Sequence, residues 1–102
     1  MRVIVLRPVA EFLDTLEVTT QADMLRLIEL LEKYGHALPM PYAKPIGRGL
    51  HELRYTGRPH VRILYGLCKS DFVLVHALKK QRSALRAHDI RLAQERLSAY
   101  CA

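Results

Sequence analysis

The spacing of apolar residues in the first third of the chain predicts one strand and two helices. Val3–Leu6 is a β-branched apolar run that ends before Pro8, which is typical of a short strand. Residues 9–16 and 24–34 then carry apolar side chains at the spacing of one helix face. These two segments are therefore expected to be helices that bury one stripe each.

Residue types also indicate where the second helix begins and ends. Thr19 or Thr20 can cap its start, because a threonine hydroxyl accepts a hydrogen bond from a free backbone N–H of the first turn. Gly35 can take the left-handed conformation in which many helices end. Residues 36–49 contain three prolines and two glycines, which exclude a regular helix or a central strand. We expect an ordered loop there that crosses the sheet.

Three segments of alternating or β-branched character follow, at Leu50–Thr56, Pro59–Cys68 and Phe72–Lys79. Short turns separate them, so they predict an antiparallel meander. Residues 84–99 return to helical spacing. The expected order is β-α-α-β-β-β-α, which is an α+β fold with a small, antiparallel-rich sheet and helices packed on one face.

Composition narrows the class of protein. The 102 residues fit a single domain spanning 1–102, and an apolar half with a charged quarter is typical of globular chains. The longest apolar run near the N-terminus is too short for a signal peptide or a membrane span, which predicts a cytoplasmic protein without a membrane partner. Cys68 and Cys101 could pair, but such low cysteine content favours reduced thiols.

The charge is distributed unevenly along the chain. Basic and acidic residues balance over residues 1–50, whereas residues 51–102 hold ten Lys or Arg against four Asp or Glu, a net charge of +6. A one-sided excess of this size indicates an anionic partner, either nucleic acid or an acidic protein segment. The alternative is a solvated basic face with no partner.

Several kinds of site are not supported by the sequence. It contains no glycine-rich phosphate motif, no Cys or His spacing of a zinc site and no obvious carboxylate pair, and its five histidines are scattered. We therefore expect no metal and no cofactor. What remains is a group of basic residues along the meander and the last helix.

This basic group suits metal-free attack on an RNA phosphodiester. Attack by the 2′-hydroxyl produces a phosphorane of high negative charge, which guanidinium and ammonium groups stabilise. Arg62 lies within an apolar strand, where burial is costly without a partner, and one strand register would place it on the same face as Lys79. His88 or a perturbed lysine could move the proton. A patch that binds phosphate without cleaving it is the alternative.

Three motifs in order resemble a known group of proteins: GLHELR at residues 49–54, VRILY at 61–65 and HALKK at 76–80. With the helix from Asp89 to Tyr100, they resemble the phage-derived HigB-like branch of the RelE/ParE toxin superfamily. The resemblance implies the toxin of a type II toxin–antitoxin pair that cleaves messenger RNA in the ribosomal A site without a metal. It also implies a cognate antitoxin, a helix-turn-helix protein, as the partner. The chain would bind operator DNA only indirectly, through this antitoxin.

The resemblance implies roles for Arg54, Arg62, Lys79 and Lys80, and the roles of the other residues follow from their charge and place in the chain. The arginines of the first two motifs, one lysine and the histidine of the last helix are candidate catalytic residues: Arg54, Arg62, Lys80 and His88. Nearby cations are candidate RNA-binding residues: Arg58, Lys79, Arg82 and Arg86. The chain departs from the family where Gln81–Ala84 replaces a threonine-rich turn and where a tyrosine has no clear counterpart, which is why His88 is assigned to proton transfer. A ParE-like poison of DNA gyrase and a non-catalytic nucleic-acid-binding module remain alternatives.

Overall fold

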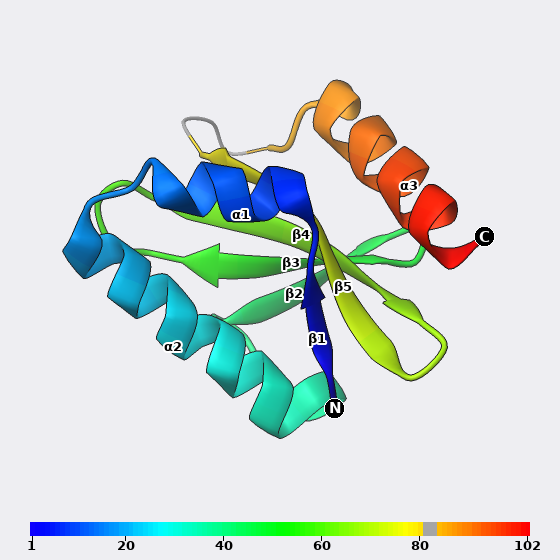
Figure 1. Cartoon of the computed structure of the whole chain (residues 1–102), viewed down its shortest axis with the longest axis horizontal. Coiled ribbons are helices and arrows are strands. Elements are labelled where there is room, and N and C mark those ends of the chain that lie inside the picture. The colour runs from blue at the N-terminus through cyan, green and yellow to red at the C-terminus, as the bar shows by residue number, and fades with distance from the viewer. Residues whose placement is uncertain (81–83) are drawn as a thin grey trace.

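The computed structural model describes residues 1–80 and 84–102, and the described part folds as five strands and three α-helices (Figure 1). Their order along the chain is β1 (Val3–Val5), α1 (Arg7–Asp14), α2 (Val18–Tyr34), β2 (Ala43–Gly47), β3 (Leu50–Tyr55), β4 (Val61–Cys68), β5 (Asp71–Lys79) and α3 (Ala87–Cys101). A 3₁₀ turn at Gly35–Ala37 follows α2. The α+β class predicted from the sequence is confirmed.

The strands form one sheet in the order β1-β5-β4-β3-β2. β1 runs parallel to β5, and the other neighbours are antiparallel. The meander predicted from the alternation is therefore confirmed as β3, β4 and β5. Arg2 donates a hydrogen bond of 2.7 Å to Asp71, so an ion pair joins the start of β1 to the start of β5.

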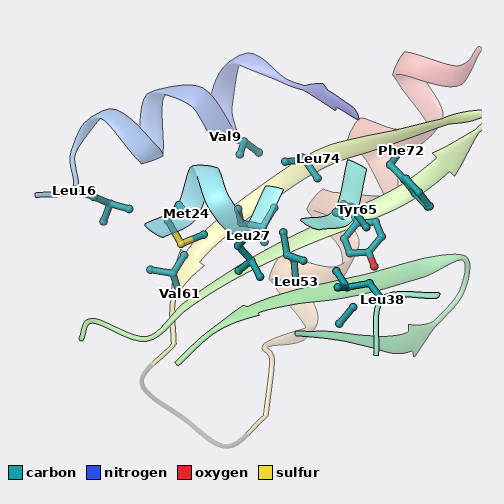
Figure 2. Close-up of a cluster of buried hydrophobic side chains, with 13 residues drawn as sticks. Val9, Leu16, Met24, Leu27, Leu38, Leu53, Val61, Tyr65, Phe72 and Leu74 are labelled. Carbon is teal, nitrogen blue, oxygen red and sulfur yellow. The ribbon is translucent and has the colours of Figure 1, made fainter. Parts of the chain in front are cut away.

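The two N-terminal helices cover one face of the sheet and form its larger core (Figure 2). Val9 of α1 and Met24 of α2 are completely buried against strand residues such as Leu53 and Leu74. Burial of such a side chain stabilises the fold by about 1.5–3 kcal/mol before entropy is counted. The apolar stripes read from the sequence are the faces that pack here.

The ends of α2 agree only in part with the prediction. The helix stops before Gly35, as predicted, and the φ of Gly35 is positive at +55°, which glycine adopts readily. Its ψ of −127° lies outside the left-handed helical conformation that was expected there. The predicted threonine cap is wrong, because the helix already begins at Val18. Thr19 and Thr20 lie inside the first turn, where Thr20 is buried.

The last helix packs on the opposite face of the sheet. Ala93 of α3 joins Leu64, Val73 and Val75 in a second buried cluster. The expectation of helices on one face therefore holds for α1 and α2 but not for α3. The reason is that β4 and β5 carry apolar side chains on both faces. Gly66 also admits α3 closely, because a Cβ there would collide with Leu97.

Residues 43–47 differ from the loop that the sequence predicts. They form the edge strand β2, which pairs with β3 from Ala43↔Leu53 to Gly47↔Leu50. Pro45 is tolerated because an edge strand leaves one row of backbone groups without a ladder partner. The last helix begins at Ala87, three residues later than expected.

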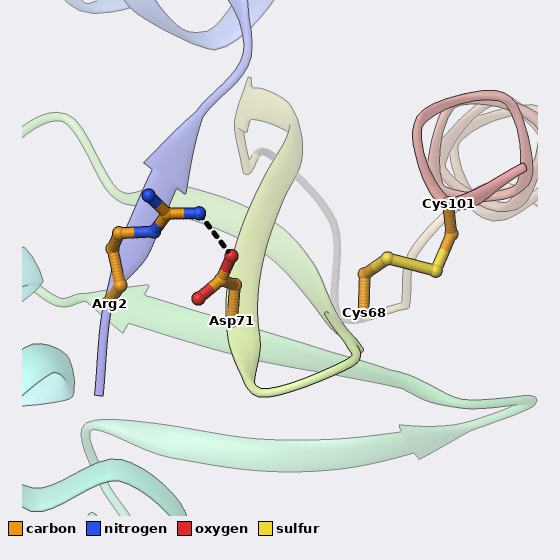
Figure 3. The surroundings of a disulfide bond; sticks show 4 residues. All are labelled: Arg2, Cys68, Asp71 and Cys101. Carbon is orange, nitrogen blue, oxygen red and sulfur yellow. Dashed lines mark hydrogen bonds and ion pairs between the residues drawn. A yellow bond between two sulfur atoms is a disulfide. The ribbon is translucent and has the colours of Figure 1, made fainter.

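The prediction of reduced thiols is wrong in this structure. Cys68 at the end of β4 and Cys101 in the last turn of α3 form a disulfide, with their Cα atoms 5.7 Å apart (Figure 3). The helix α3 packs across β4 and β5, and its last turn meets the end of β4, which brings the two cysteines together. Across residues 1–80 and 84–102, no helix is both long and apolar enough to cross a bilayer.

Candidate nucleic-acid interface

A hollow of about 280 Å³ lies where β5 ends and α3 begins. The ionisable residues that line it are Lys79, Lys80, Arg86, His88 and Asp89, and we call this site the basic hollow. The hollow therefore brings together four basic residues that the sequence singles out. They are the two lysines of the HALKK motif, and Arg86 and His88 at the start of the last helix.

Backbone contacts hold the two sides of the basic hollow. The Lys80 N–H donates to the carbonyl of His60 at 2.9 Å, which extends the pairing of β5 with the chain before β4. Arg86 caps α3 through its backbone, and its carbonyl accepts the N–H of Asp89 at 3.1 Å. Asp89 sits in the first turn of α3, where the helix dipole favours a negative charge.

A cluster of three side chains fixes the position of Asp89. His76 Nε2 lies 2.8 Å from Asp89 Oδ1, and Arg96 Nη1 lies 3.1 Å from His76 Nδ1. Arginine is always protonated, so it donates to Nδ1, and the imidazole proton on Nε2 is donated to Asp89. Arg96 also donates to the carbonyl of Val75 at 3.0 Å. The cluster thus joins β5 to α3 beside the basic hollow.

An irregularity in β5 makes this cluster possible. Leu64 pairs with His76 and Tyr65 pairs with Leu74, so Val75 is an extra residue in β5. Such a bulge lets two successive side chains point to the same face. Val75 enters the core beneath α3, and His76 reaches Asp89 on that same side.

Arg54 and Arg62 lie in a second group, centred on a buried carboxylate. Glu52 Oε1 is 3.3 Å from Arg54 Nε and 3.5 Å from Arg62 Nε. Glu52 is 3 % exposed and Arg62 is 4 % exposed. Arg62 Nη1 also donates to the carbonyls of Tyr55 and Val61, at 3.2 and 3.1 Å. Burial lowers the pKa of Arg62, while the Glu52 carboxylate opposes that effect.

This group contains two guanidinium ions and one carboxylate. Within the described residues, the Nε atoms of Arg54 and Arg62 are buried without a hydrogen-bond partner. Burial of an excess positive charge is costly, and an anion near the exposed edge of the group would reduce that cost. The side chain of Arg54 is 22 % exposed and provides that edge.

The strand register connects the buried group to the basic hollow. Arg54 pairs with Arg62, and Arg62 pairs with Leu78, which lines the basic hollow. Directly paired residues share a face of the sheet, so this row leads to the basic hollow on the α3 side. Lys79 pairs with Val61 and belongs to the other face. The register that would have put Lys79 beside Arg62 is therefore not adopted.

Two further residues named from the sequence lie apart from the basic hollow. Arg58 is exposed in the turn between β3 and β4 and is not among the lining residues. Arg82 lies outside the described residues. Among residues 1–80 and 84–102, no three His, Cys, Asp or Glu side chains gather as a metal site would require.

The family model that matches this chain is described as phage-derived protein Gp49-like, and it matches residues 11–98. The chain belongs to the Gp49-like family. This family is associated with toxins of toxin–antitoxin pairs, and the α+β architecture is consistent with a RelE-like fold, so the chain is toxin-like. No curated protein matches it. The matched residues of this Gp49-like chain include the whole basic hollow and the arginine row.

Two acidic residues of the candidate site, Glu52 and Asp89, were not predicted from the sequence. Glu52 could have been found, because it alternates with Arg54 on one strand and so must share a face with it. Asp89 could not have been linked to His76, because that contact depends on the bulge in β5. Glu52 lies between the guanidinium groups of Arg54 and Arg62, and Asp89 accepts a hydrogen bond from His76.

Proposed function

We propose that this chain is the toxin of a type II toxin–antitoxin pair that cleaves messenger RNA on the ribosome and is neutralised by a cognate antitoxin. The observation that carries the proposal is the convergence of Lys80, Arg86 and His88 around one hollow, which Lys79 borders at the end of β5. Membership of a toxin-like family supports the same assignment. The basic hollow is then the place where the scissile phosphate binds.

The reaction needs charge stabilisation and proton transfer. The 2′-oxygen attacks the neighbouring phosphorus, the bond from phosphorus to the 5′-oxygen breaks, and a 2′,3′-cyclic phosphate and a 5′-hydroxyl result. Lys80 and Arg86 stabilise the charge that develops on the phosphoryl oxygens. We assign to His88 the removal of the proton from the 2′-hydroxyl and the delivery of a proton to the departing 5′-oxygen, because imidazole is suited to both steps. No step requires a metal.

Arg54 and Arg62 act from the buried row. The Arg62 side chain is 5 % exposed and its donors face Glu52 and backbone carbonyls, so it acts by holding the row and raising the local positive potential. Arg54 is the member of the row that remains open enough to meet a phosphate. Arg58 and Arg82 are assigned to flanking phosphates from charge and chain position alone.

A non-catalytic nucleic-acid-binding module is the second candidate. The observation that favours it is that Asp89, the carboxylate of the basic hollow, is already engaged by His76. A patch of cations binds phosphate without any proton acceptor. Cleavage must therefore be measured separately from binding.

The test is to express the chain in bacterial cells and map the 5′ ends of messenger RNA after induction. The proposal predicts growth arrest with new 5′ ends inside translated reading frames, biased toward particular codons. DNA-damage signalling without such ends would indicate a gyrase poison instead. Binding of RNA without either effect would leave the binding module.

A further inference from the structure

A second and larger hollow lies on the other side of the first turns of α3. It has a volume of about 560 Å³ and separates α3 from the turn between β2 and β3. We call it the α3 groove, lined chiefly by Ile46, Arg48, Ile90, Arg91 and Gln94. None of the described residues that line it is acidic.

The α3 groove has an apolar floor that packs against the core and two exposed arginines at its edges. Ile46 of β2 and Ile90 of α3 both pack against the second buried cluster. Arg48 and Arg91 are exposed and come from two different elements. A groove with a fixed apolar floor and two guanidinium groups suits a ligand that has both apolar and anionic parts.

The backbone at Arg48 is unusual. Its φ is +56°, and it stands between Gly47 and Gly49, whose φ angles are +88° and +77°. The left-handed region suits glycine, and a long side chain there is strained. A strained residue is a reason to look for a function at that position. The cation at Arg48 is placed at the mouth of the α3 groove by this turn.

The α3 groove and the basic hollow adjoin across the first turn of α3, where one residue of each is in contact. Arg91 Nη2, from the groove, lies 3.4 Å from Nδ1 of His88, which lines the basic hollow. Arginine is the donor of this contact. Cations therefore follow one another from Lys80 through Arg86 and Arg91 to Arg48, along a path that crosses the start of α3.

We propose that the α3 groove binds the sugar–phosphate backbone of the single-stranded RNA whose scissile phosphate occupies the basic hollow. Arg48 and Arg91 bind phosphate oxygens, for which the planar guanidinium is suited, and the apolar floor takes a ribose or a base. A polyanion matches this line of cations because it carries one charge per nucleotide. The choice of RNA as the polyanion rests on the proposed function.

The experiment measures RNA binding without cleavage. A fluorescein-labelled 12-nucleotide 2′-O-methyl oligouridylate has no free 2′-hydroxyl and cannot be cut, so its fluorescence anisotropy reports binding alone. The full chain is compared with the Arg48→Gln/Arg91→Gln double variant. The matched control is Arg26→Gln/Lys33→Gln, which removes the same charge from exposed positions on α2, on the opposite face of the sheet.

The groove variant is expected to bind at least about tenfold more weakly than the parent at low salt, and the control within about twofold. Loss of two phosphate contacts should also reduce the slope of log K against log salt by about 1.4. Equal binding by the groove variant and the control would overturn the proposal. A labelled 12-residue polyglutamate peptide is measured in the same way. If the groove variant lost affinity for this peptide but not for the RNA, the proposal would also be overturned, because the partner would then be an acidic protein.

Folding and function are controlled separately. Both arginines are exposed, so the urea midpoint of the groove variant should match that of the parent. The Arg91→Gln single variant replaces the double variant if it does not. Weaker RNA binding by the groove variant, with no messenger cleavage in cells, would retain the groove and reject the proposed function. Messenger cleavage with RNA binding unchanged by the substitutions would reject the groove alone.

Discussion

Arg62 lies within the sheet with its Nε atom 3.5 Å from Oε1 of Glu52, and both side chains are almost completely buried. A buried ion pair gains little over apolar packing, but the loss of one partner leaves a charge without compensation. The pair is therefore a structural requirement as well as a source of positive potential beside the basic hollow.

The first prediction concerns this pair. Arg62→Met puts an apolar side chain in place of the guanidinium. The Glu52 carboxylate then keeps only the more exposed Arg54 as an ionic partner, and the carbonyls of Tyr55 and Val61 lose the donor that Arg62 provides. We expect the free energy of unfolding to fall by about 3 kcal/mol. Urea denaturation followed by circular dichroism measures it.

The control for this prediction is a double-variant cycle. Glu52→Gln/Arg62→Met removes both charges, and it should cost less than the sum of the two single variants. Strict additivity, or a cost well below 1 kcal/mol for Arg62→Met alone, would show that the buried pair does not stabilise the sheet.

The second prediction uses the pH dependence of stability. Burial raises the pKa of Tyr65 to about 12, because the phenolate is disfavoured away from water. The unfolded chain releases this proton near pH 10, so stability is fully present below pH 10 and is lost as the pH rises toward 12. We expect a loss of up to about 2 kcal/mol attributable to Tyr65 over that interval.

The comparison variant is Tyr65→Phe, which keeps the ring that packs edge-on against Phe72 at a centroid distance of 5.6 Å. Its unfolding free energy should fall less between pH 10 and pH 12 than that of the parent, because the lysines and the other tyrosines are common to both proteins. Identical alkaline profiles would contradict the assignment.

The third prediction concerns the disulfide. Cys68 and Cys101 are 33 residues apart, and a crosslink of that span restricts the unfolded chain. Replacement of Cys101 by Ser should lower the free energy of unfolding by roughly 3–4 kcal/mol. Dithiothreitol should lower the stability of the parent to that of the Cys101→Ser variant. If the reductant destabilised both proteins equally, the disulfide could not be its target.

The sequence predicts much of the sheet because its strands and turns are local. Alternation identifies β3, β4 and β5, and Gly35 marks the end of α2. The edge strand β2 is missed because Pro45 reads as a strand breaker, although an edge position tolerates it. The face covered by α3 is missed because apolar residues such as Leu64 and Val73, on the second face of β4 and β5, reveal a second core only after the strands are paired.

The candidate site is predictable to the extent that it is local in the chain. Lys79, Lys80, Arg86 and His88 are close in sequence and meet at one hollow. Contacts between strands depend on the strand register, which no local pattern determines. The register places Arg62 beside Glu52 and puts Lys79 on the other face of the sheet. The disulfide likewise requires the docked position of α3.

The central claim is that the basic hollow cleaves RNA, and the most direct test is the rate of cleavage of ribosome-bound messenger RNA by the purified chain. The parent should produce fragments with 5′-hydroxyl ends, and Lys80→Ala should slow cleavage by about 100-fold or more, since it removes a charge that stabilises the transition state. The matched control is Lys33→Ala, an exposed lysine on α2, which should cleave at the parental rate. Fragments with 5′-phosphate ends, or a Lys80→Ala variant as fast as Lys33→Ala, would contradict the account.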